Sequence, residues 1–183
     1  MFRATGGSGR NSAVRSLDEP EYLYFWGHEP AGNGVGPTCL SQWWPAEFVV
    51  GGRAYPTAEH FMMSEKALLF GDADIAGQIL RTTDPKEAKA LGRQISGFDE
   101  SRWEQRRFEI VVEGNLAKFT QHPTLRDFLL GTRDAVLVEA SPEDRIWGIG
   151  LAAHDARVVD PDTWPGLNLL GLALMAVRSR LAE

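Results

Sequence analysis

A proline and a threonine separate an extended segment that ends at Tyr55 from a helix that we expect to begin at Ala58. Thr57 is a favourable N-cap, because its hydroxyl can accept a hydrogen bond from a free backbone N–H of the first helical turn. Glu59 falls within that turn, where the helix dipole favours an ionised carboxylate. Lys66 follows two turns later on nearly the same face. The helix therefore carries a carboxylate and an ammonium along one line.

This line of charge has two interpretations. The two side chains can form part of a ligand site, or they can belong to a solvated surface helix. His60 follows Glu59 directly in the sequence, so its side chain projects about 100° around the helix. That direction favours a structural role for the histidine. The rest of the chain decides between a site and a surface for the other two residues.

Composition limits the class of protein. A chain of 183 residues suffices for one domain with a substantial core. No apolar run approaches the ~18–20 residues of a membrane span, and the N-terminus lacks the apolar core of a signal peptide. We expect a flexible tail over residues 1–20 and a single domain over residues 21–183. One cysteine, Cys39, excludes an internal disulfide and makes the cytoplasm the expected location.

Charge limits the partners. The formal net charge is −6, whereas a protein that grips long nucleic acid needs a basic excess to neutralise phosphates. We therefore expect no extended nucleic-acid surface and no membrane partner, while a small anionic ligand or one modified nucleotide stays compatible. The four histidines and the cysteine have no metal-ligand spacing. We expect neither a metal ion nor another cofactor.

The predicted elements form an α+β domain that is mostly helical, with a small antiparallel sheet. Gly51 and Gly52 join two extended runs into a hairpin, since both residues can take positive φ. Asp84 and Ser101 each begin a helix-start pattern with a glutamate three residues later. The expected strands are 22–26, 46–50, 53–55 and 135–140, and the expected helices are 58–70, 72–81, 85–95, 101–120, 122–131 and 168–181.

Two further stretches carry residue types that suit a ligand. Trp103 lies about 140° from the apolar stripe of its helix, so it either packs on the preceding loop or stacks on a ligand. Residues 141–166 form a loop too long to lack a function in a compact domain. Asp144, Trp147 and Gly148 lie in it, and glycine lets backbone N–H groups approach phosphate or sugar oxygens. A merely solvated acidic loop is the alternative. Asn168, after the loop, is first an N-cap candidate.

Six motifs follow one another along the chain: Pro56-Thr57-Ala58-Glu59-His60 with Lys66, then Gly92-Arg93, Trp103, Phe119, Asp144 before Trp147-Gly148, and Asn168-x-Leu170-Gly171. In this order they resemble the YbiA-like family, also called NADAR for a proposed link to NAD and ADP-ribose metabolism. The resemblance covers about residues 22–181 and implies a YbiA-like fold.

The resemblance implies an N-glycosidase. Known members of the family cleave the base–ribose bond of phosphorylated riboflavin-pathway intermediates, or remove ADP-ribose from guanine in nucleic acid or nucleotides. The implied partner is a ribose-phosphate or ADP-ribose conjugate, including ADP-ribosylated guanine in nucleic acid. A non-catalytic module that binds ADP-ribose or a nucleotide is the alternative.

The resemblance also assigns site residues. Glu59, Trp103 and Asp144 match positions regarded as catalytic or substrate-contacting, and Lys66 matches a lysine thought to attack the anomeric carbon of the sugar. The family commonly has Asn and Phe where this chain has Gln42 and Trp43, a difference that bears on the substrate more than on the reaction. The substrate-binding candidates are Phe25, Trp26, Ser41, Trp43, His60, Arg93, Trp147, Gly148 and Asn168.

Cleavage of a ribosyl–nitrogen bond builds positive charge on the sugar and leaves electrons on the base. Glu59 suits the stabilisation of that charge or the activation of water, and Asp144 can orient a ribose hydroxyl or act as an acid. Trp103 offers a flat wall for the base. Lys66 has two routes: as a cation it would grip a phosphate, and as a neutral amine it would form a Schiff base with the opened sugar.

Overall fold

The computed structural model describes residues 20–29 and 34–183. The predicted N-terminal tail, except for Pro20, lies outside these residues. The described chain forms six α-helices, four short strands and three 3₁₀ turns, which confirms the mostly helical α+β architecture. The helices are α1 (Ala58–Leu69), α2 (Ala73–Ile79), α3 (Pro85–Leu91), α4 (Glu100–Gln121), α5 (Pro123–Gly131) and α6 (Leu169–Ala182). The 3₁₀ turns are Pro37–Leu40, Ala156–Val159 and Pro161–Thr163.

Capping side chains set the starts of the helices. Thr57 caps α1 as expected, since its hydroxyl accepts the backbone N–H of His60. The expected start of α4 at Ser101 is wrong. Asp99 lies two residues earlier, and its carboxylate accepts the Arg102 N–H at 2.7 Å, so the helix begins at Glu100. A carboxylate at the N-cap also gains from the helix dipole, which a neutral hydroxyl does not.

The strands form two separate pairs. β2 (Phe48–Val50) and β3 (Arg53–Tyr55) are the antiparallel hairpin, with positive φ at both Gly51 and Gly52 as the turn requires. β1 (Tyr22–Phe25) and β4 (Val136–Glu139) pair in parallel, and Phe25 lies opposite Glu139. The expected antiparallel pairing therefore holds for the hairpin. Strands β1 and β4 pair in parallel instead, and they are more than 100 residues apart in the chain.

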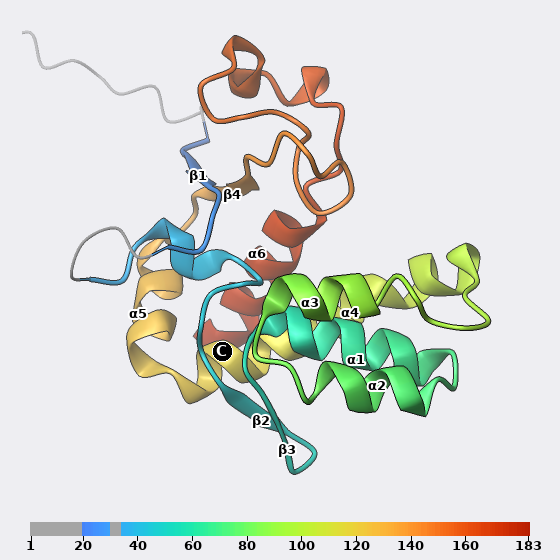
Figure 1. Cartoon of the computed structure of the whole chain (residues 1–183). Coiled ribbons are helices and arrows are strands. Elements are labelled where there is room, and N and C mark those ends of the chain that lie inside the picture. Colours follow the sequence, from blue (N-terminus) through green and yellow to red (C-terminus); the bar gives the residue numbers. More distant parts are fainter. Residues whose placement is uncertain (1–19, 30–33) are drawn as a thin grey trace, which may run out of the picture.

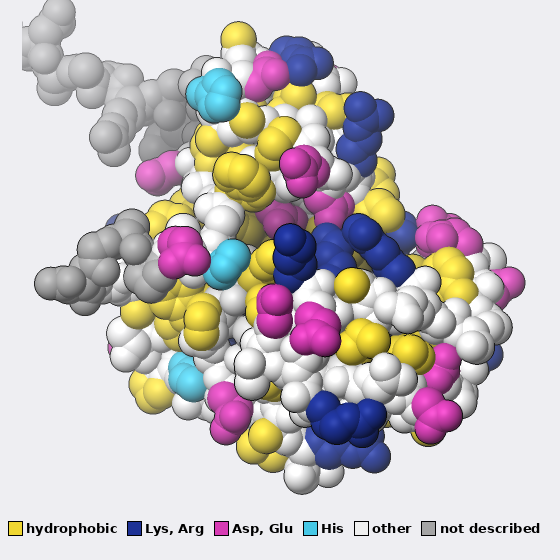
Figure 2. Space-filling model, in the orientation of Figure 1, with side chains coloured by type: hydrophobic (Ala, Val, Ile, Leu, Met, Phe, Trp, Pro, Cys, Tyr) yellow, Lys and Arg dark blue, Asp and Glu magenta, His cyan; other side chains and the backbone are white. Residues whose placement is uncertain are grey.

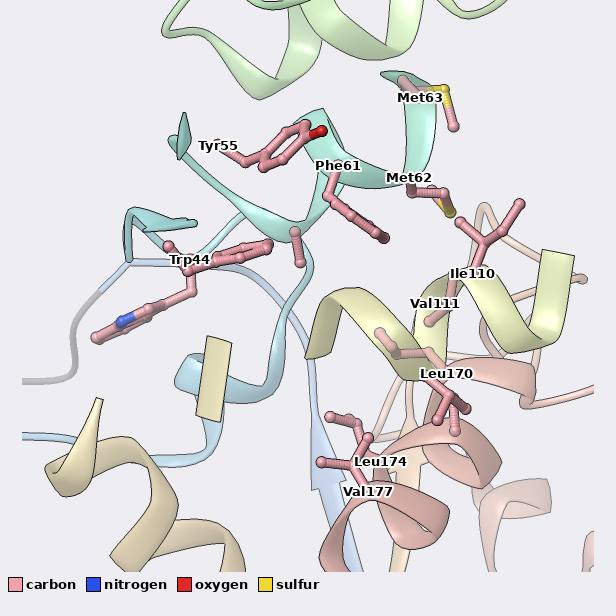
Figure 3. Close-up of a cluster of buried hydrophobic side chains, with 14 of the residues drawn as sticks. Trp44, Tyr55, Phe61, Met62, Met63, Ile110, Val111, Leu170, Leu174 and Val177 are labelled. Atoms are coloured by element: carbon pink, nitrogen blue, oxygen red, sulfur yellow. The ribbon is translucent and has the colours of Figure 1, made fainter. Parts of the chain in front are cut away.

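The main core lies between α1, α4 and α6. Figure 3 shows Phe61 and Met62 of α1 pointing toward Ile110 and Val111 of α4, with three side chains of α6 below them, while Met63 lies on another side of α1 and packs against Gly92. All of these core side chains are at least nine-tenths buried. Figure 1 shows the hairpin at one end of the molecule and the long loop after β4, in orange, at the other. No helix among the described residues is long and apolar enough to cross a membrane.

Strand β4 separates two apolar clusters and sets the direction of its last side chain. Leu137 belongs to the main core, whereas Val138 belongs to a smaller cluster with Ile149, Leu151 and Val158 beneath the long loop. Successive side chains of a strand point to opposite faces. Glu139 therefore returns to the face of Leu137, at the carboxyl end of the strand, where the apolar core gives way to a cavity.

Candidate active site

A cavity of about 400 Å³ opens at the carboxyl ends of the parallel strands β1 and β4. Segments from five parts of the chain line it. They are residues 26–28 after β1, residues 41–43 before the hairpin, α1 through Glu59 and Met62, the α3 region through Lys89 and Arg93, and residues 139–147. In Figure 2, Lys and Arg side chains cross the middle of this face, over α3, beside Asp and Glu side chains that lie deeper.

Glu59 is the most enclosed acidic group of the cavity, with 2% of its surface exposed. The Glu59 Oε1 atom is buried and has no hydrogen-bond partner in the part of the chain that the structure describes. Burial raises the pKa of Glu59 to about 7, against the opposing effects of Lys89 and Trp43. Desolvation therefore acts against the ionised form that the start of the helix favours.

Asp144 is fixed by its own loop. Its Oδ1 accepts the backbone N–H groups of Ile146 and Trp147 at 2.9 and 2.8 Å. Its Oδ2 lies 3.9 Å from Nζ of Lys89 on α3. One oxygen of the carboxylate thus holds the loop in shape, and the other faces the cations of the cavity.

Glu139 is a further carboxylate of the cavity, beside Glu59, Glu143 and Asp144, and none of the sequence motifs contains it. It lines the cavity, and its Oε2 is buried without a hydrogen-bond partner among the described residues. Burial and, next, the charge of Asp144 raise its pKa to about 8, while Lys89 opposes the shift. Side chains alternate between the two faces of the strand expected over residues 135–140, so Glu139 falls on the same face as Leu137. This alternation is the signal that would have identified it.

Three tryptophans supply the aromatic lining. Trp26, Trp43 and Trp147 all border the cavity, and Trp26 is 59% exposed at its mouth. The ring of His28 lies 5.5 Å from that of Trp43, centroid to centroid. Flat aromatic faces of this kind can stack on a planar base.

Two buried polar residues of α4 hold the wall formed by residues 39–43. Lys118 donates hydrogen bonds to the carbonyl oxygens of Cys39 (2.7 Å) and Ser41 (2.9 Å). Asn115 donates to the side-chain oxygen of Gln42 at 2.7 Å. The sequence gives no local signal for either role, because the segment that the two residues hold is more than 70 residues away in the chain.

Lys66 and Trp103 do not line the cavity. Nζ of Lys66 donates to the Gly92 carbonyl at 3.2 Å and lies 4.3 Å from the centroid of Phe98 and 5.4 Å from that of Trp103. Trp103 is 7% exposed and belongs to the main core. The geometry therefore supports the packing alternative for Trp103, and the aromatic lining of the cavity comes from Trp26, Trp43 and Trp147 instead.

Three other candidates, Phe25, His60 and Gly148, lie behind the cavity wall. Phe25 packs in the main core, and His60 is fully buried with Nδ1 2.8 Å from the Thr57 hydroxyl. Gly148 has no room for a Cβ between Glu139, Ser141 and Asp144. These three support the site rather than line it. The candidates that do line it are Glu59, Asp144, Trp26, Ser41, Trp43, Arg93 and Trp147.

Asn168 does not act as the expected N-cap. It has a left-handed backbone conformation (φ 53°), and its side chain makes no capping hydrogen bond. Instead, Oδ1 accepts the backbone N–H of Glu139 at 3.0 Å and Nδ2 donates to the Leu137 carbonyl at 2.9 Å. The asparagine ties the end of β4 to the start of α6, and so fixes the backbone of a cavity residue.

A more open depression of about 900 Å³ lies at the other end of β1, between Glu21, Phe128 and Arg133. It gathers no comparable set of enclosed charged groups. Among the described residues, no three His, Cys, Asp or Glu side chains are arranged to hold a metal ion. The cavity at the carboxyl ends of the strands is the candidate active site.

The fold and the cavity define a small, mostly helical domain with a carboxylate-rich pocket of ligand size. The family model of the NADAR domain matches residues 24–182. The chain therefore belongs to the NADAR domain family, and the family assignment from sequence motifs is confirmed.

Relatives of known name agree with this assignment. An N-glycosidase of Acanthamoeba polyphaga mimivirus is 41% identical over 167 residues, which cover 88% of this chain and 97% of that protein. The N-glycosidase YbiA of Escherichia coli K12 is 34% identical over 139 residues, covering 76% of this chain and 77% of that protein. A riboflavin biosynthesis protein of Vibrio vulnificus is 31% identical over 172 residues, covering 93% of this chain and 41% of that protein.

A solved structure has the same fold. The NMR structure of E. coli YbiA superposes with a TM-score of 0.72 at 28% sequence identity, covering 93% of this chain and 90% of the other. The expectation of a YbiA-like fold is therefore confirmed.

Proposed function

We propose that this protein hydrolyses the N-glycosyl bond of a phosphorylated ribosylamino-pyrimidine, an intermediate of riboflavin synthesis. The observation that carries the proposal is the composition of one cavity. It combines enclosed carboxylates, three tryptophans and two cations. These match the three parts of such a substrate, namely the sugar, the base and the phosphate.

The carboxylates suit the reacting sugar. As the bond to the base breaks, positive charge grows on the ribose ring, and a nearby carboxylate stabilises it. Glu59 lies at the bottom of the cavity with a pKa of about 7, so a large fraction is ionised at neutral pH. The same group can accept a proton from the attacking water. Asp144 is positioned by its loop to orient a ribose hydroxyl.

The cations suit the phosphate. Lys89 and Arg93 are four residues apart and line the same wall of the cavity. Nζ of Lys89 has only one acidic contact of 4 Å or less among the described residues, with Asp144 at 3.9 Å. An ammonium and a guanidinium on one wall form a natural site for a phosphate dianion.

The size of the cavity favours a compact substrate. About 400 Å³ is at the low end of the range for ligand pockets. One relative is named a riboflavin biosynthesis protein. Both observations support the small pyrimidine over a larger conjugate.

ADP-ribosylated guanine is the second candidate. Trp26 is 59% exposed at the mouth of the cavity, where its ring can stack on a base outside the pocket. A conjugate with a second base could use this surface. A non-catalytic binding module is the alternative to both.

One experiment separates these three functions. The purified protein is incubated side by side with the phosphorylated ribosylamino-pyrimidine, with ADP-ribosylated guanosine and with ADP-ribose, and released base is followed by chromatography. We expect release from the pyrimidine nucleotide. Release from the guanine conjugate alone would favour the second candidate. Calorimetric binding without any released base would favour the binding module and overturn the proposal.

A further inference from the structure

The function proposed above gives no role to Glu139, a partly buried acidic residue of the cavity. It is the last residue of β4 and lies on the face that turns toward the cavity. Its backbone is held twice, since its N–H donates to Asn168 Oδ1 and its carbonyl accepts the Ile149 N–H, both at 3.0 Å. The side chain therefore starts from a rigid support.

The carboxyl group itself is enclosed but unsatisfied. Its Oε2 is buried and has no hydrogen-bond partner in residues 20–29 and 34–183. A buried polar oxygen without a partner costs free energy unless a ligand satisfies it. Because this oxygen belongs to a cavity-lining residue, a bound substrate is the group that would pair with it.

Two neighbouring carboxylates determine the charge of this group. A third negative charge beside Glu59 and Asp144 is unfavourable, and burial acts in the same direction. Lys89 opposes both effects only in part, and the pKa of Glu139 rises to about 8. The charged and titratable side chains around the cavity are His28, Glu59, Lys89, Arg93, Glu143 and Asp144.

We infer that Glu139 is a further catalytic residue, which holds a proton in the resting enzyme and donates it to the leaving base. This inference rests on the proposed N-glycosidase function. The three carboxyl groups then divide the work. Glu139 acts as the acid, Glu59 stabilises the sugar cation and takes a proton from water, and Asp144 orients the sugar.

The step balances without any further reactant. The bond between C1′ of the ribose and the nitrogen of the base breaks, and its electron pair stays with the nitrogen. The proton of Glu139 joins that nitrogen, and the base leaves neutral. Water adds to C1′ while Glu59 takes one of its protons. Transfer of that proton from Glu59 to Glu139, through solvent, restores the resting state.

The first test compares two leaving groups. Glu139→Gln keeps the shape and one hydrogen-bond donor but cannot give up a proton. We expect hydrolysis of the ribosylamino-pyrimidine phosphate to fall by about 10²–10⁴-fold, the usual contribution of a general acid. Nicotinamide mononucleotide needs no proton, because its pyridinium leaves as a neutral base. Its hydrolysis should fall by less than about tenfold. Equal losses on both substrates, or no loss on either, would overturn the inference.

The second test does not depend on activity. Protein labelled with ¹³C at the glutamate carboxyl is titrated by NMR, and the Glu139 signal is assigned by its absence from Glu139→Gln. We expect a protonated carboxyl at pH 7, and an ionised one at pH 6 would overturn the inference. Glu113→Gln, on an exposed position of α4, is the matched control and should leave both the signal and the activity unchanged. If the wild type cleaves neither substrate, the proposed function fails, and the titration still shows whether Glu139 holds a proton.

Discussion

Lys118 on α4 donates a 2.9 Å hydrogen bond to the carbonyl oxygen of Ser41, at the wall of the active-site cavity. The lysine is fully buried and also donates to Cys39. Together with Asn115, which donates to Gln42, it supports the segment that carries Trp43, and Trp43 lines the same cavity as Glu59. A residue of the core thus positions one wall of the candidate active site.

Lys118→Met tests this support. Methionine fills the space of the lysine stem but leaves two buried carbonyls without donors, at about 1–3 kcal/mol each when no water replaces the lost bond. We expect a lower free energy of unfolding in urea, together with a lower kcat, because the wall at Trp43 moves. Arg106→Met, at an exposed position on the same helix, is the control. An active and equally stable Lys118→Met protein would show that the wall does not depend on this contact.

Glu59→Gln tests the sugar-stabilising carboxylate. The amide keeps the size of the side chain and removes its charge, so we expect turnover to fall by at least about 10²-fold. The thermal midpoint should stay the same or rise, since an enclosed carboxyl with an unsatisfied oxygen is costly. Glu47→Gln, at an exposed site outside the cavity, serves as the reference. Unchanged turnover would remove Glu59 from the mechanism.

Lys89→Met tests the phosphate site. Loss of one of two cations should raise KM for the phosphorylated substrate by about 10-fold or more, since charge-assisted hydrogen bonds contribute about 1.5–3 kcal/mol. The dephosphorylated nucleoside should show little difference between wild type and variant. Lys86→Met, an exposed lysine on the same helix, is the control. Equal effects on both substrates would place the phosphate elsewhere.

Local signals explain what the sequence predicts well. The hairpin follows from two adjacent glycines, and the start of α1 follows from Thr57, because each depends on contacts within four residues. The position of Glu59 in a site follows from the same helix start together with the family motifs. The protonation of Glu59 does not follow from these local signals, because the burial of its side chain depends on how α3 and the loop after β4 pack against α1.

Long-range pairing explains what the sequence does not predict. The parallel contact of β1 with β4 has no local signature, so Glu139 is not recognisable as a cavity residue until the strands are placed. Asn168 looks like an N-cap, yet its side chain binds the end of β4. Trp103 is off the apolar stripe of its helix, but it packs in the main core beside Lys66 and does not line the cavity.

Borohydride trapping tests the covalent route through Lys66. Burial lowers the pKa of this lysine, but Glu100 and Glu59 act in the opposite direction. Its Nζ is engaged by the Gly92 carbonyl and the Phe98 ring, outside the cavity lining. We therefore expect no mass increase when substrate and borohydride are added together. An adduct on the wild type that disappears in Lys66→Ala would show that Nζ reaches the sugar during turnover.

The pH dependence of stability tests the enclosed carboxyl groups. The pKa values of Glu59 and Glu139 rise on folding, from 4.5 to about 7 and about 8. Between pH 4.5 and about pH 8, the folded state therefore binds more protons than the unfolded state. The contribution of the two groups to stability is complete below about pH 4.5 and is lost as the pH rises through 7 and 8. The pKa of Lys118 falls on folding to about 7, which gives the opposite slope above that value.

The double variant Glu59→Gln, Glu139→Gln isolates the carboxyl contribution, because Lys118 and His60 are present in both proteins. We expect the unfolding free energy of the variant, relative to the wild type, to increase from pH 5 to pH 8. The slope of this free-energy difference against pH should approach about 1.4 kcal/mol per pH unit for each proton that folding binds. Urea denaturation at four pH values measures it. A constant difference across this range would mean that both groups ionise as freely in the folded protein as in water.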